Sequence, residues 1–382
     1  MVQECKRIAI VGAGAAGCIS AYLLLKAGCD VTIFDYSTPL RTLLPTGGGR
    51  CNLAHAEYDF KELAKNYPRG EKFLFSVFSK FSTYDTISLF EELGIRTYVQ
   101  DDNRIFPVSN SAKQVREIIL ENIKKAQFIK ECVTDIKLIN SEFKLKTEKA
   151  EYLFTDVIIA TGGAKTTKQI CNLKHNIIEK KPSLVGLNTN IKELSGISLK
   201  GVVYKELALC GDILFTHFGI SGPLTYKISA IKAYDKYPYD LVFDLYPEDF
   251  DFQKILNLNP HKDIKNVLSE FLPKKFVLYL LQVLQIQENQ KACMIDGKTR
   301  DRILDKIHNF EIKVLDANKG EETVTAGGID LQQINSKTME SKIIPRLYFI
   351  GEVLDIDGFC GGFNLQNAWS TAFVASDAII NS

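Results

Sequence analysis

The chain opens with two short apolar runs separated by a helix-like segment. Residues 7–11 form a mostly apolar run that ends at Gly12, and residues 13–26 read as a helix with small residues on one face. A second apolar run at 31–34 closes on Asp35. This order, which takes about thirty residues, predicts a β-α-β unit at the start of a doubly wound parallel sheet.

The period of the pattern changes from helical to strand-like after residue 126. Helical segments at 72–94, with Ser82 or Thr83 as a cap, and at 112–126 precede the change. Period-two runs then predict a three-stranded antiparallel meander at 132–139, 142–147 and 151–154. A buried strand at 156–160 follows and ends in Thr161-Gly162-Gly163.

The middle of the chain reads as an insertion into this α/β pattern. A lysine-rich helical stretch spans 252–310. The strands predicted around it lie at 185–190, 202–210, 213–216 and 240–246, with a hairpin at 311–317 and 321–325. Residues 347–380 return to the first pattern with an apolar run, a glycine-rich loop and a helix from 365 onward.

The first loop carries a nucleotide-binding motif in the expected context. Residues 12–17 read Gly-Ala-Gly-Ala-Ala-Gly, and this G-x-G-x-x-G follows a strand and opens a helix. Such a loop turns tightly, lets backbone approach a pyrophosphate and offers the helix N-terminus to it. A carboxylate at position 35 suits ribose hydroxyls and disfavours a 2′-phosphate. The candidate cofactor-binding residues here are Gly12, Gly14, Ala15, Ala16, Gly17 and Asp35.

Three further loops favour FAD over NAD as the cofactor. Residues 46–52 hold three consecutive glycines, which let backbone lie along a large ligand, and Arg50 adds a fixed charge for phosphate. The meander leads to the second loop, residues 160–163. Residues 351–366 would place a second helix N-terminus at the ligand, where it would stabilise the negative charge of a reduced flavin ring.

At this point the sequence resembles the BaiN/YhiN-like flavoproteins, which are FAD-dependent oxidoreductases. The resemblance runs almost end to end and rests most on Gly-Gly-Gly-Arg-Cys-Asn at 47–52 and on residues 351–355 with 361–366. Further matching pieces lie at 104–109, 160–163, 182–185, 215–223, 325–329 and 338–342. The fold that it implies is a Rossmann-type α/β FAD-binding domain with an inserted β-barrel-like domain and a small helical domain.

The resemblance and the loop pattern together assign domains and site residues. We expect an FAD-binding domain at 1–185 and 341–382, a β-rich inserted domain at 186–250 and 311–340, and a helical subdomain at 251–310. Besides the fingerprint, the candidate cofactor-binding residues are Arg41, Gly48, Gly49, Arg50, Cys51, Asn52, Val133, Thr161, Gly162, Gly351, Glu352, Asp355, Gly361, Gly362, Asn364 and Leu365.

Three departures from the family pattern bear on the substrate. Leu40-Arg41-Thr42 keeps the arginine but lacks the usual lysine, and Cys360 replaces another small residue. The segment after Gly163 is shorter than in the family and begins Ala164-Lys165-Thr166-Thr167. Because this loop would help to shape the nucleotide or substrate surface, its shortening leaves the substrate preference inherited from the family in question.

Charge and cysteine usage set limits on the function. The 47 Lys and Arg residues nearly cancel the 46 Asp and Glu residues, which argues against a strong pull on nucleic acid. The longest apolar segment, 276–286, is too short to span a bilayer, and no apolar leader precedes the first strand. Nine scattered cysteines without a C-x-x-C pair indicate reduced cytoplasmic thiols rather than disulfides or a metal site.

The function predicted from the sequence is that of a cytoplasmic FAD oxidoreductase. Reduced pyridine nucleotide, NAD(P)H, would bind transiently and reduce the flavin, which would then reduce a small organic substrate or oxygen. His217 is the candidate general acid, although a structural histidine in its turn explains it equally well. Two alternatives stay open: an RNA-modifying flavoprotein that uses a folate or similar carbon donor, and a flavin redox sensor without turnover.

Overall fold

The computed structural model describes residues 6–163, 173–246, 251–318 and 324–382. The chain forms two compact units, unit 1 from residues 1–181 and 324–382 and unit 2 from residues 182–323. The contacts of residues 324–340 place them in unit 1, whereas the sequence pattern groups them with the inserted domain. Among the described residues, no helix is long and apolar enough to cross a membrane.

Unit 1 is built on a parallel sheet in which four of the five strands are apolar and buried along almost their whole length, while the strand at one edge is largely exposed. The five strands lie in the order β19-β10-β1-β2-β6. Their bounds are β1 (Arg7–Val11), β2 (Asp30–Phe34), β6 (Gln127–Ile129), β10 (Asp156–Ile159) and β19 (Leu347–Phe349). β1 is central and pairs in parallel with both β2 and β10, as the β-α-β pattern predicts.

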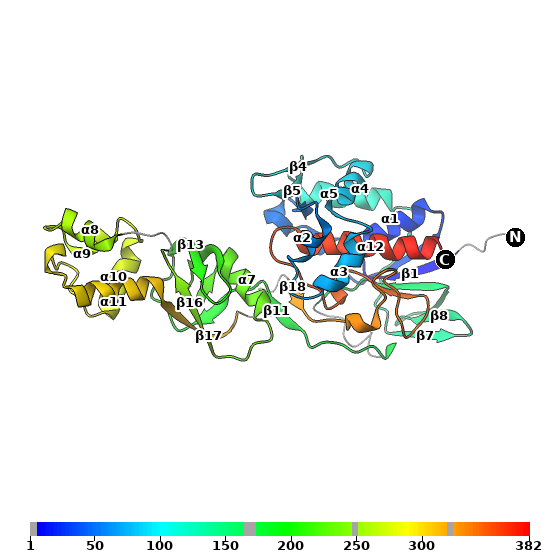
Figure 1. The fold of residues 1–382 in the computed structure, drawn as a ribbon. Helices are drawn as coiled ribbons and strands as arrows, with labels where there is room; N and C mark the ends of the chain where they lie inside the picture. The colour runs from blue at the N-terminus through cyan, green and yellow to red at the C-terminus, as the bar shows by residue number, and fades with distance from the viewer. Residues whose placement is uncertain (1–5, 164–172, 247–250, 319–323) are drawn as a thin grey trace. The chain divides into compact units, whose positions relative to one another are not determined.

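Two helices from opposite ends of the sequence lie side by side in unit 1 (Figure 1). α1 (Ala15–Lys26) packs along α12 (Phe363–Ile380), and the hydroxyls of Ser20 and Ser376 hydrogen-bond between them at 2.9 Å. The small residues on the buried face of α1 permit this close approach. The start of the chain and the segment after the insertion therefore share one core.

The helical pattern at 72–94 forms two helices, and the predicted cap at Ser82 starts the second of them. α3 (Glu71–Phe78) and α4 (Thr83–Glu92) are separated by a break at Ser82. The Ser82 N–H donates to the carboxylate of Asp85 at 2.7 Å in a capping box, which starts the second helix. In the described part of unit 1, the other helices are α2 (Phe60–Ala64) and α5 (Ala112–Asn122).

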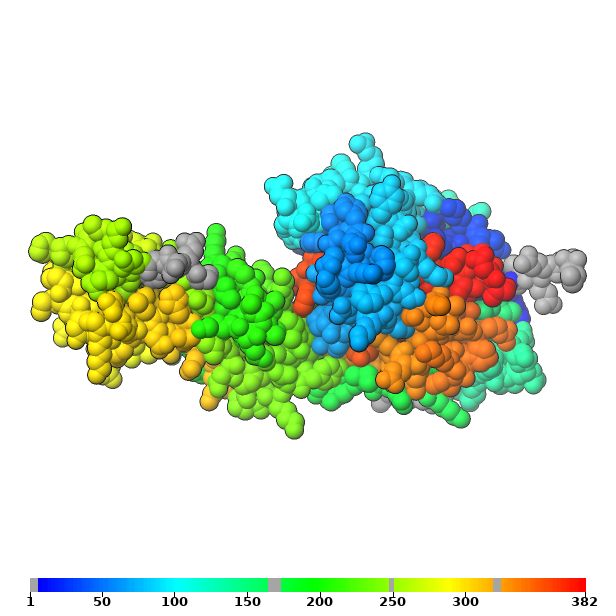
Figure 2. Space-filling model, viewed as in Figure 1, coloured from blue at the N-terminus to red at the C-terminus, as the bar shows by residue number. Residues whose placement is uncertain are grey.

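Two small antiparallel sheets complete unit 1. The predicted meander is confirmed as β7 (Asp135–Ile139), β8 (Glu142–Lys146) and β9 (Glu151–Phe154). The other sheet has the order β3-β5-β4 and contains β3 (Ala54–His55), β4 (Thr97–Val99) and β5 (Arg104–Pro107). In Figure 2 the blue surface of α2 and α3 adjoins the orange surface near residue 335, consistent with the closeness of Gly70 to Leu331.

Unit 2 confirms the predicted barrel. Six strands close in the order β12-β15-β14-β13-β16-β17. Their bounds are β12 (Leu187–Thr189), β13 (Ser198–Tyr204), β14 (Leu209–Phe215), β15 (Gly219–Ser221), β16 (Tyr239–Asp244) and β17 (Phe310–Ala317). The helices are α7 (Pro223–Ile231), α8 (Phe252–Leu258), α9 (Ile264–Leu268), α10 (Lys274–Val283) and α11 (Gly297–His308).

Two strand predictions in the insertion are wrong. The run at 202–210 contains a turn, because β13 ends at Tyr204 and β14 begins at Leu209. The hairpin predicted after residue 311 does not form, since β12 and β16 occupy both edges of β17. Residues 319–323 of that hairpin, and Ala164–Thr167 of the shortened loop, lie outside the described residues. Short strands β11 (Lys181–Ser183) and β18 (Val324–Ala326) flank the insertion in sequence.

Candidate functional site

The predicted cofactor loops meet at the carboxyl edge of the parallel sheet. The loops that follow β1, β2, β10 and β19 all leave this edge, because parallel strands end on the same side. Gly12 permits a close approach of the loops after β1 and β10: a Cβ built on it would lie 2.3 Å from the carbonyl oxygen of Ala160. The loops after β1 and β10 diverge here, and such a switch point is where open α/β sheets bind ligands.

The fingerprint glycines have three different environments. Gly12 has φ +112°, and a Cβ on Gly17 would lie 2.0 Å from the Gly12 oxygen. A Cβ on Gly14, by contrast, would meet nothing within 4 Å. Gly14 caps α1, whose first turn contains no acidic residue. The N–H groups of this helix start therefore lie beside open space, which suits a pyrophosphate.

Asp35 lies at the end of β2 and holds the fingerprint loop. Its carboxylate accepts hydrogen bonds from the N–H of Ala13 at 2.7 Å and from the N–H and hydroxyl of Ser37 at 2.7 and 2.8 Å. One lone pair on Oδ2 is then left for a ribose hydroxyl. The side chain therefore has a structural role that the sequence reading did not include.

The glycine-rich loop, η2 (Thr46–Gly49), has a left-handed backbone at its glycines. A Cβ on Gly47 would lie 2.8 Å from both the Asn52 nitrogen and the Phe106 ring, while Gly48 and Gly49 face open space. The guanidinium of Arg50 stacks 4.1 Å from the Phe106 ring centroid. Arg41 is exposed in η1 (Arg41–Leu43), just before this loop.

Substitution of Gly47 should destabilise unit 1 more than substitution of Gly48. Gly47→Ala combines a left-handed backbone with a backbone clash, and we expect a loss of about 3 kcal/mol in unfolding free energy. Gly48→Ala has the same kind of backbone but open space, so the expected loss is about 1 kcal/mol. Urea unfolding of both variants checks this. Equal losses would contradict the packing described for Gly47.

The glycine-rich loop and the C-terminal loop pack against each other. A Cβ on Gly362 would lie 2.5 Å from the Ala54 oxygen, and the rings of His55 and Phe363 stack at 4.7 Å. The indole N–H of Trp369 donates to the Leu53 oxygen at 2.9 Å. The start of α12 is thereby placed against the segment that follows the glycine-rich loop.

Of the two loop cysteines, Cys51 is buried and Cys360 is exposed. Burial raises the pKa of the Cys51 thiol to about 12, which disfavours a thiolate at neutral pH.

The acidic loop after β19 is fixed by contacts on both sides. The Gly351 N–H donates to the Thr371 hydroxyl at 2.9 Å, and a Cβ on Gly351 would lie 3.0 Å from Ala16 in the first turn of α1. The Asn364 side chain hydrogen-bonds the N–H and the carbonyl of Gly358, both at 2.8 Å. Asn364 therefore braces the loop with its side chain, a role that the sequence reading did not foresee.

Several buried polar atoms at these loops have no partner among the described residues. They are Asn52 Oδ1, Thr161 Oγ1, Asp355 Oδ1 and Asn367 Oδ1. Buried polar atoms are otherwise almost always hydrogen-bonded. Three of the four belong to predicted cofactor residues on three separate loops. The residues present therefore fit FAD, whose hydroxyl and N–H groups would donate to the amide and carboxylate oxygens, and whose acceptor oxygens would take the Thr161 hydroxyl.

The remaining predicted residues are less informative. Gly162 and Gly361 both have positive φ and lie in the loops after β10 and before α12. Leu365 is half-buried in the first turn of α12, and Val133 is buried after β6. His217 is exposed in unit 2, between β14 and β15, with its ring edge-on to Phe218 at 5.2 Å.

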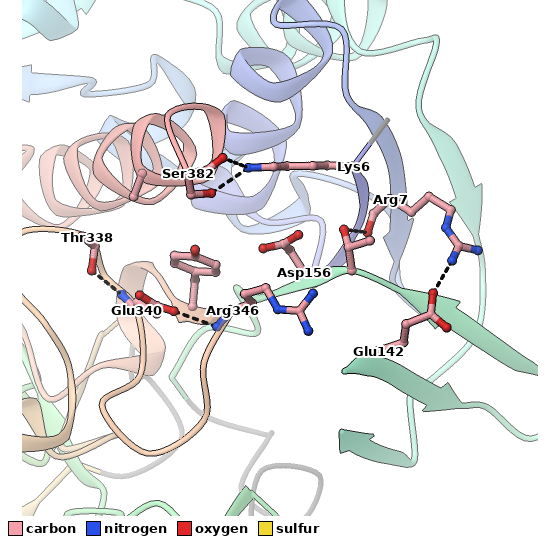
Figure 3. Close-up of a pocket in the computed structure, with 11 residues that line it drawn as sticks. Lys6, Arg7, Glu142, Asp156, Thr338, Glu340, Arg346 and Ser382 are labelled. Atoms are coloured by element: carbon pink, nitrogen blue, oxygen red, sulfur yellow. Dashed lines mark hydrogen bonds and ion pairs between the residues drawn. The ribbon is translucent and has the colours of Figure 1, made fainter. Parts of the chain in front are cut away.

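A cavity of about 710 Å³ lies at the other edge of the sheet (Figure 3). It is lined by Arg7 and Asp156, which begin β1 and β10, and by charged residues such as Lys6 and Arg346. Most of these charges already have protein partners: Arg7 pairs with Glu142 at 2.5 Å. The cavity is remote from the loops at the carboxyl ends and is not part of the candidate site.

Four residues of the site carry no signal that the sequence reading used. The hydroxyl of Tyr67 donates to the Phe363 oxygen at 2.6 Å, and Arg69 pairs with the fully buried Asp357. Lys180 donates to the Gly163 oxygen, and Asn367 is one of the unpartnered residues. Only Asn367 could have been found in sequence, as an amide on the buried face of an apolar helix.

A parallel-sheet unit with a phosphate-binding turn and unpartnered polar atoms around it defines a Rossmann-type flavoprotein. The profile of the family described as HI0933-like protein Rossmann domain matches residues 6–378. The chain therefore belongs to this family of FAD-dependent oxidoreductases, as its resemblance in sequence predicts.

Curated relatives match the chain from end to end. It is 31% identical to the ribosomal RNA dihydrouridine synthase of Haemophilus influenzae and 28% identical to that of Escherichia coli, with 97% of each chain covered. It is 26% identical to the 3-dehydro-bile acid delta(4,6)-reductase of Clostridium scindens, over 97% of this chain and 98% of the relative.

Solved structures share the fold at low identity. A flavocytochrome c3 fumarate reductase matches 99% of this chain and 78% of its own, with 14% identity and a TM-score of 0.50. A 3-ketosteroid delta1-dehydrogenase from Sterolibacterium denitrificans matches 99% and 100%, with 12% identity and a TM-score of 0.50.

Proposed function

We propose that this protein is an FAD-dependent reductase of carbon–carbon double bonds conjugated to a carbonyl, and that its substrate is a uracil base in RNA. The observation that carries the proposal is the end-to-end match to two ribosomal RNA dihydrouridine synthases. Conversion of uridine to dihydrouridine adds a hydride and a proton across a ring double bond. The bile acid relative is also named for a reductase, which supports reduction as the shared chemistry.

The candidate site supports the cofactor half of this proposal. When bound and reduced, FAD supplies the hydride, and NAD(P)H is the proposed transient reductant. The first turn of α1 would hold the pyrophosphate, and Asp35 the ribose. Asn52, Thr161 and Asp355 offer the unpartnered oxygens that would orient the rest of the cofactor. His217 is the proposed general acid that gives the proton to the second carbon.

The charge distribution places a limit on how RNA would bind. The whole chain is nearly neutral, but residues 251–310 carry ten Lys and Arg against seven Asp and Glu. Several of these lysines are paired, for example Lys262 with Glu270 at 2.7 Å. We therefore propose that few phosphates are contacted and that the affinity for RNA depends only modestly on salt.

Anaerobic turnover on RNA tests the proposed function. Purified protein with FAD and NADH or NADPH is incubated with unmodified ribosomal RNA transcripts, and the nucleosides are analysed by mass spectrometry. We expect a uridine that has gained two hydrogen atoms. His217→Ala should reduce the yield while the flavin is still reduced.

A second candidate substrate is a small dienone, favoured by the match to the bile acid reductase. If RNA stays unmodified while a steroid dienone is reduced, this candidate replaces RNA. If neither nicotinamide reduces the flavin and neither substrate reacts, both candidates fail and the redox-sensor alternative gains support.

A further inference from the structure

Glu352 lies directly after β19, in η6 (Gly351–Val353), and connects three parts of unit 1. Its carboxylate accepts the N–H of Thr325 at 2.9 Å, and the N–H of Gly163 also hydrogen-bonds to it. A Cβ on Gly163 would lie 2.7 Å from the Glu352 Oε1 and 2.8 Å from Thr325. Only a glycine at position 163 allows this three-way contact without a shift of its neighbours.

Glu352 is surrounded by groups that act on its charge in opposite directions. Burial, which has the largest effect, and the carboxylate of Asp357 both raise its pKa, and the net value is about 7. The N–H groups of Thr325 and Gly163 and the ammonium of Lys180 lower it. The two N–H groups and the ammonium therefore stabilise the ionised form of Glu352 against the effect of burial.

Lys180 is the cationic group in this set. Its ammonium donates to the Gly163 oxygen, so Lys180 and Glu352 hold the same residue from its two sides. Burial lowers the pKa of Lys180, and the charge of Glu352 raises it. In sequence, Lys180 precedes the point where the chain leaves unit 1, and Thr325 follows the point where it returns.

We propose that Lys180 is a positioning residue that compensates the charge of Glu352 at the cofactor edge. Its hydrogen bond to the Gly163 oxygen joins the outgoing segment of unit 1 to the loop after β10, and Glu352 joins the same loop to the returning segment at Thr325. The inference that these contacts shape the cofactor site rests on the proposed location of FAD. The contacts of Lys180 and Glu352 with Gly163 and Thr325 are present without the cofactor, so their effect can be measured in the apoprotein.

The pH dependence has a definite sign. Above neutrality Glu352 is ionised and is the stronger acceptor, so the Thr325 amide should exchange more slowly after correction for the intrinsic rate. Below neutrality the protonated carboxyl holds it less well. The exchange rate of the Thr325 amide should therefore change in a step near the pKa of Glu352. Without the ammonium of Lys180 this pKa rises, and the pH of the step should move upward by about one unit or more.

Hydrogen exchange of the peptide that contains Thr325 tests the proposal in the apoprotein. Lys180→Met should shift the pH step upward, while Lys180→Arg should restore it because the charge is kept. Lys181→Met is the matched control, since Lys181 makes only a surface pair with Glu179 at 2.6 Å. Glu352→Gln should abolish the step.

FAD titration of the same proteins provides the second readout. Lys180→Met should weaken FAD affinity at neutral pH, because the loop after β10 loses the hydrogen bond that the ammonium donates to the Gly163 oxygen. Lys180→Arg and Lys181→Met should bind FAD as the unmodified protein does. If the unmodified protein binds no FAD, the proposed cofactor site fails. The pH step in hydrogen exchange still decides whether Lys180 compensates the charge of Glu352.

An unchanged exchange step in Lys180→Met, or an equal shift in Lys181→Met, would overturn the proposal. If Lys180→Met does not fold, Glu352→Gln decides. A pH step that survives in Glu352→Gln would show that another group controls the Thr325 amide.

Discussion

Replacement of Arg69 by methionine should lower the unfolding free energy of unit 1 by about 3–5 kcal/mol. The guanidinium of Arg69 binds both carboxylate oxygens of Asp357, and Asp357 is completely buried. Methionine keeps the apolar stem but leaves the carboxylate without its charge partner. A buried, uncompensated charge is among the most destabilising features that a substitution can create.

Controls separate this effect from the loss of any surface charge. Lys65→Met removes a pair with Glu62 in which both side chains are more than half exposed, so the expected loss is below about 1 kcal/mol. The double variant Arg69→Met, Asp357→Leu should recover much of the loss. Urea unfolding of the three variants measures this, and a loss in Arg69→Met no larger than in Lys65→Met would contradict the pairing.

Gly17→Val should abolish FAD binding and destabilise unit 1. A Cβ at this position would lie 2.0 Å from the Gly12 oxygen, which belongs to backbone and cannot move aside. To admit the valine, α1 must move away from the loop after β1. The first turn of α1 would then no longer face the position proposed for the pyrophosphate, and purified protein should lack visible flavin absorbance.

Gly14→Ala is the matched substitution that separates folding from cofactor binding. Nothing lies within 4 Å of a Cβ at Gly14, and its φ of −79° suits any residue, so stability should be unchanged. The added methyl group enters the open space beside the helix start, and we expect FAD affinity to fall at least about tenfold. Unchanged FAD affinity in Gly14→Ala would place the pyrophosphate elsewhere.

The parts of the fold that sequence reading predicted correctly are those set by local patterns. The β-α-β unit, the meander and four of the five strands of the parallel sheet follow from period and from glycines at fixed spacing. The edge strand β6 was missed because it is short and largely exposed. The hairpin after residue 311 failed because the competing partners of β17 come from β12 and β16, far away in sequence. The cap at Ser82 could be predicted from its residue type, whereas apolar periodicity continues through residues 79–82 and hides the end of α3 at Phe78.

The candidate site divides in the same way. Loop residues such as Gly12 and Gly47 could be predicted because their backbone conformation needs glycine. The roles of Asn364 and Asp35 as braces could not, since they depend on where each loop folds back. The Arg69–Asp357 pair joins residues 288 positions apart, and no periodicity or motif connects them.

The side-by-side packing of α1 and α12 has a consequence for the order of events during synthesis. β1, β2 and β10 emerge from the ribosome before all of residues 182–323, whereas β19 and α12 emerge after them. Until then the outer edge of β10 has no strand partner, and the face of α1 that packs against α12 is exposed to solvent. Unit 2 can complete its barrel while the nascent nucleotide-binding sheet is unfinished, a period in which chaperones would have most to protect.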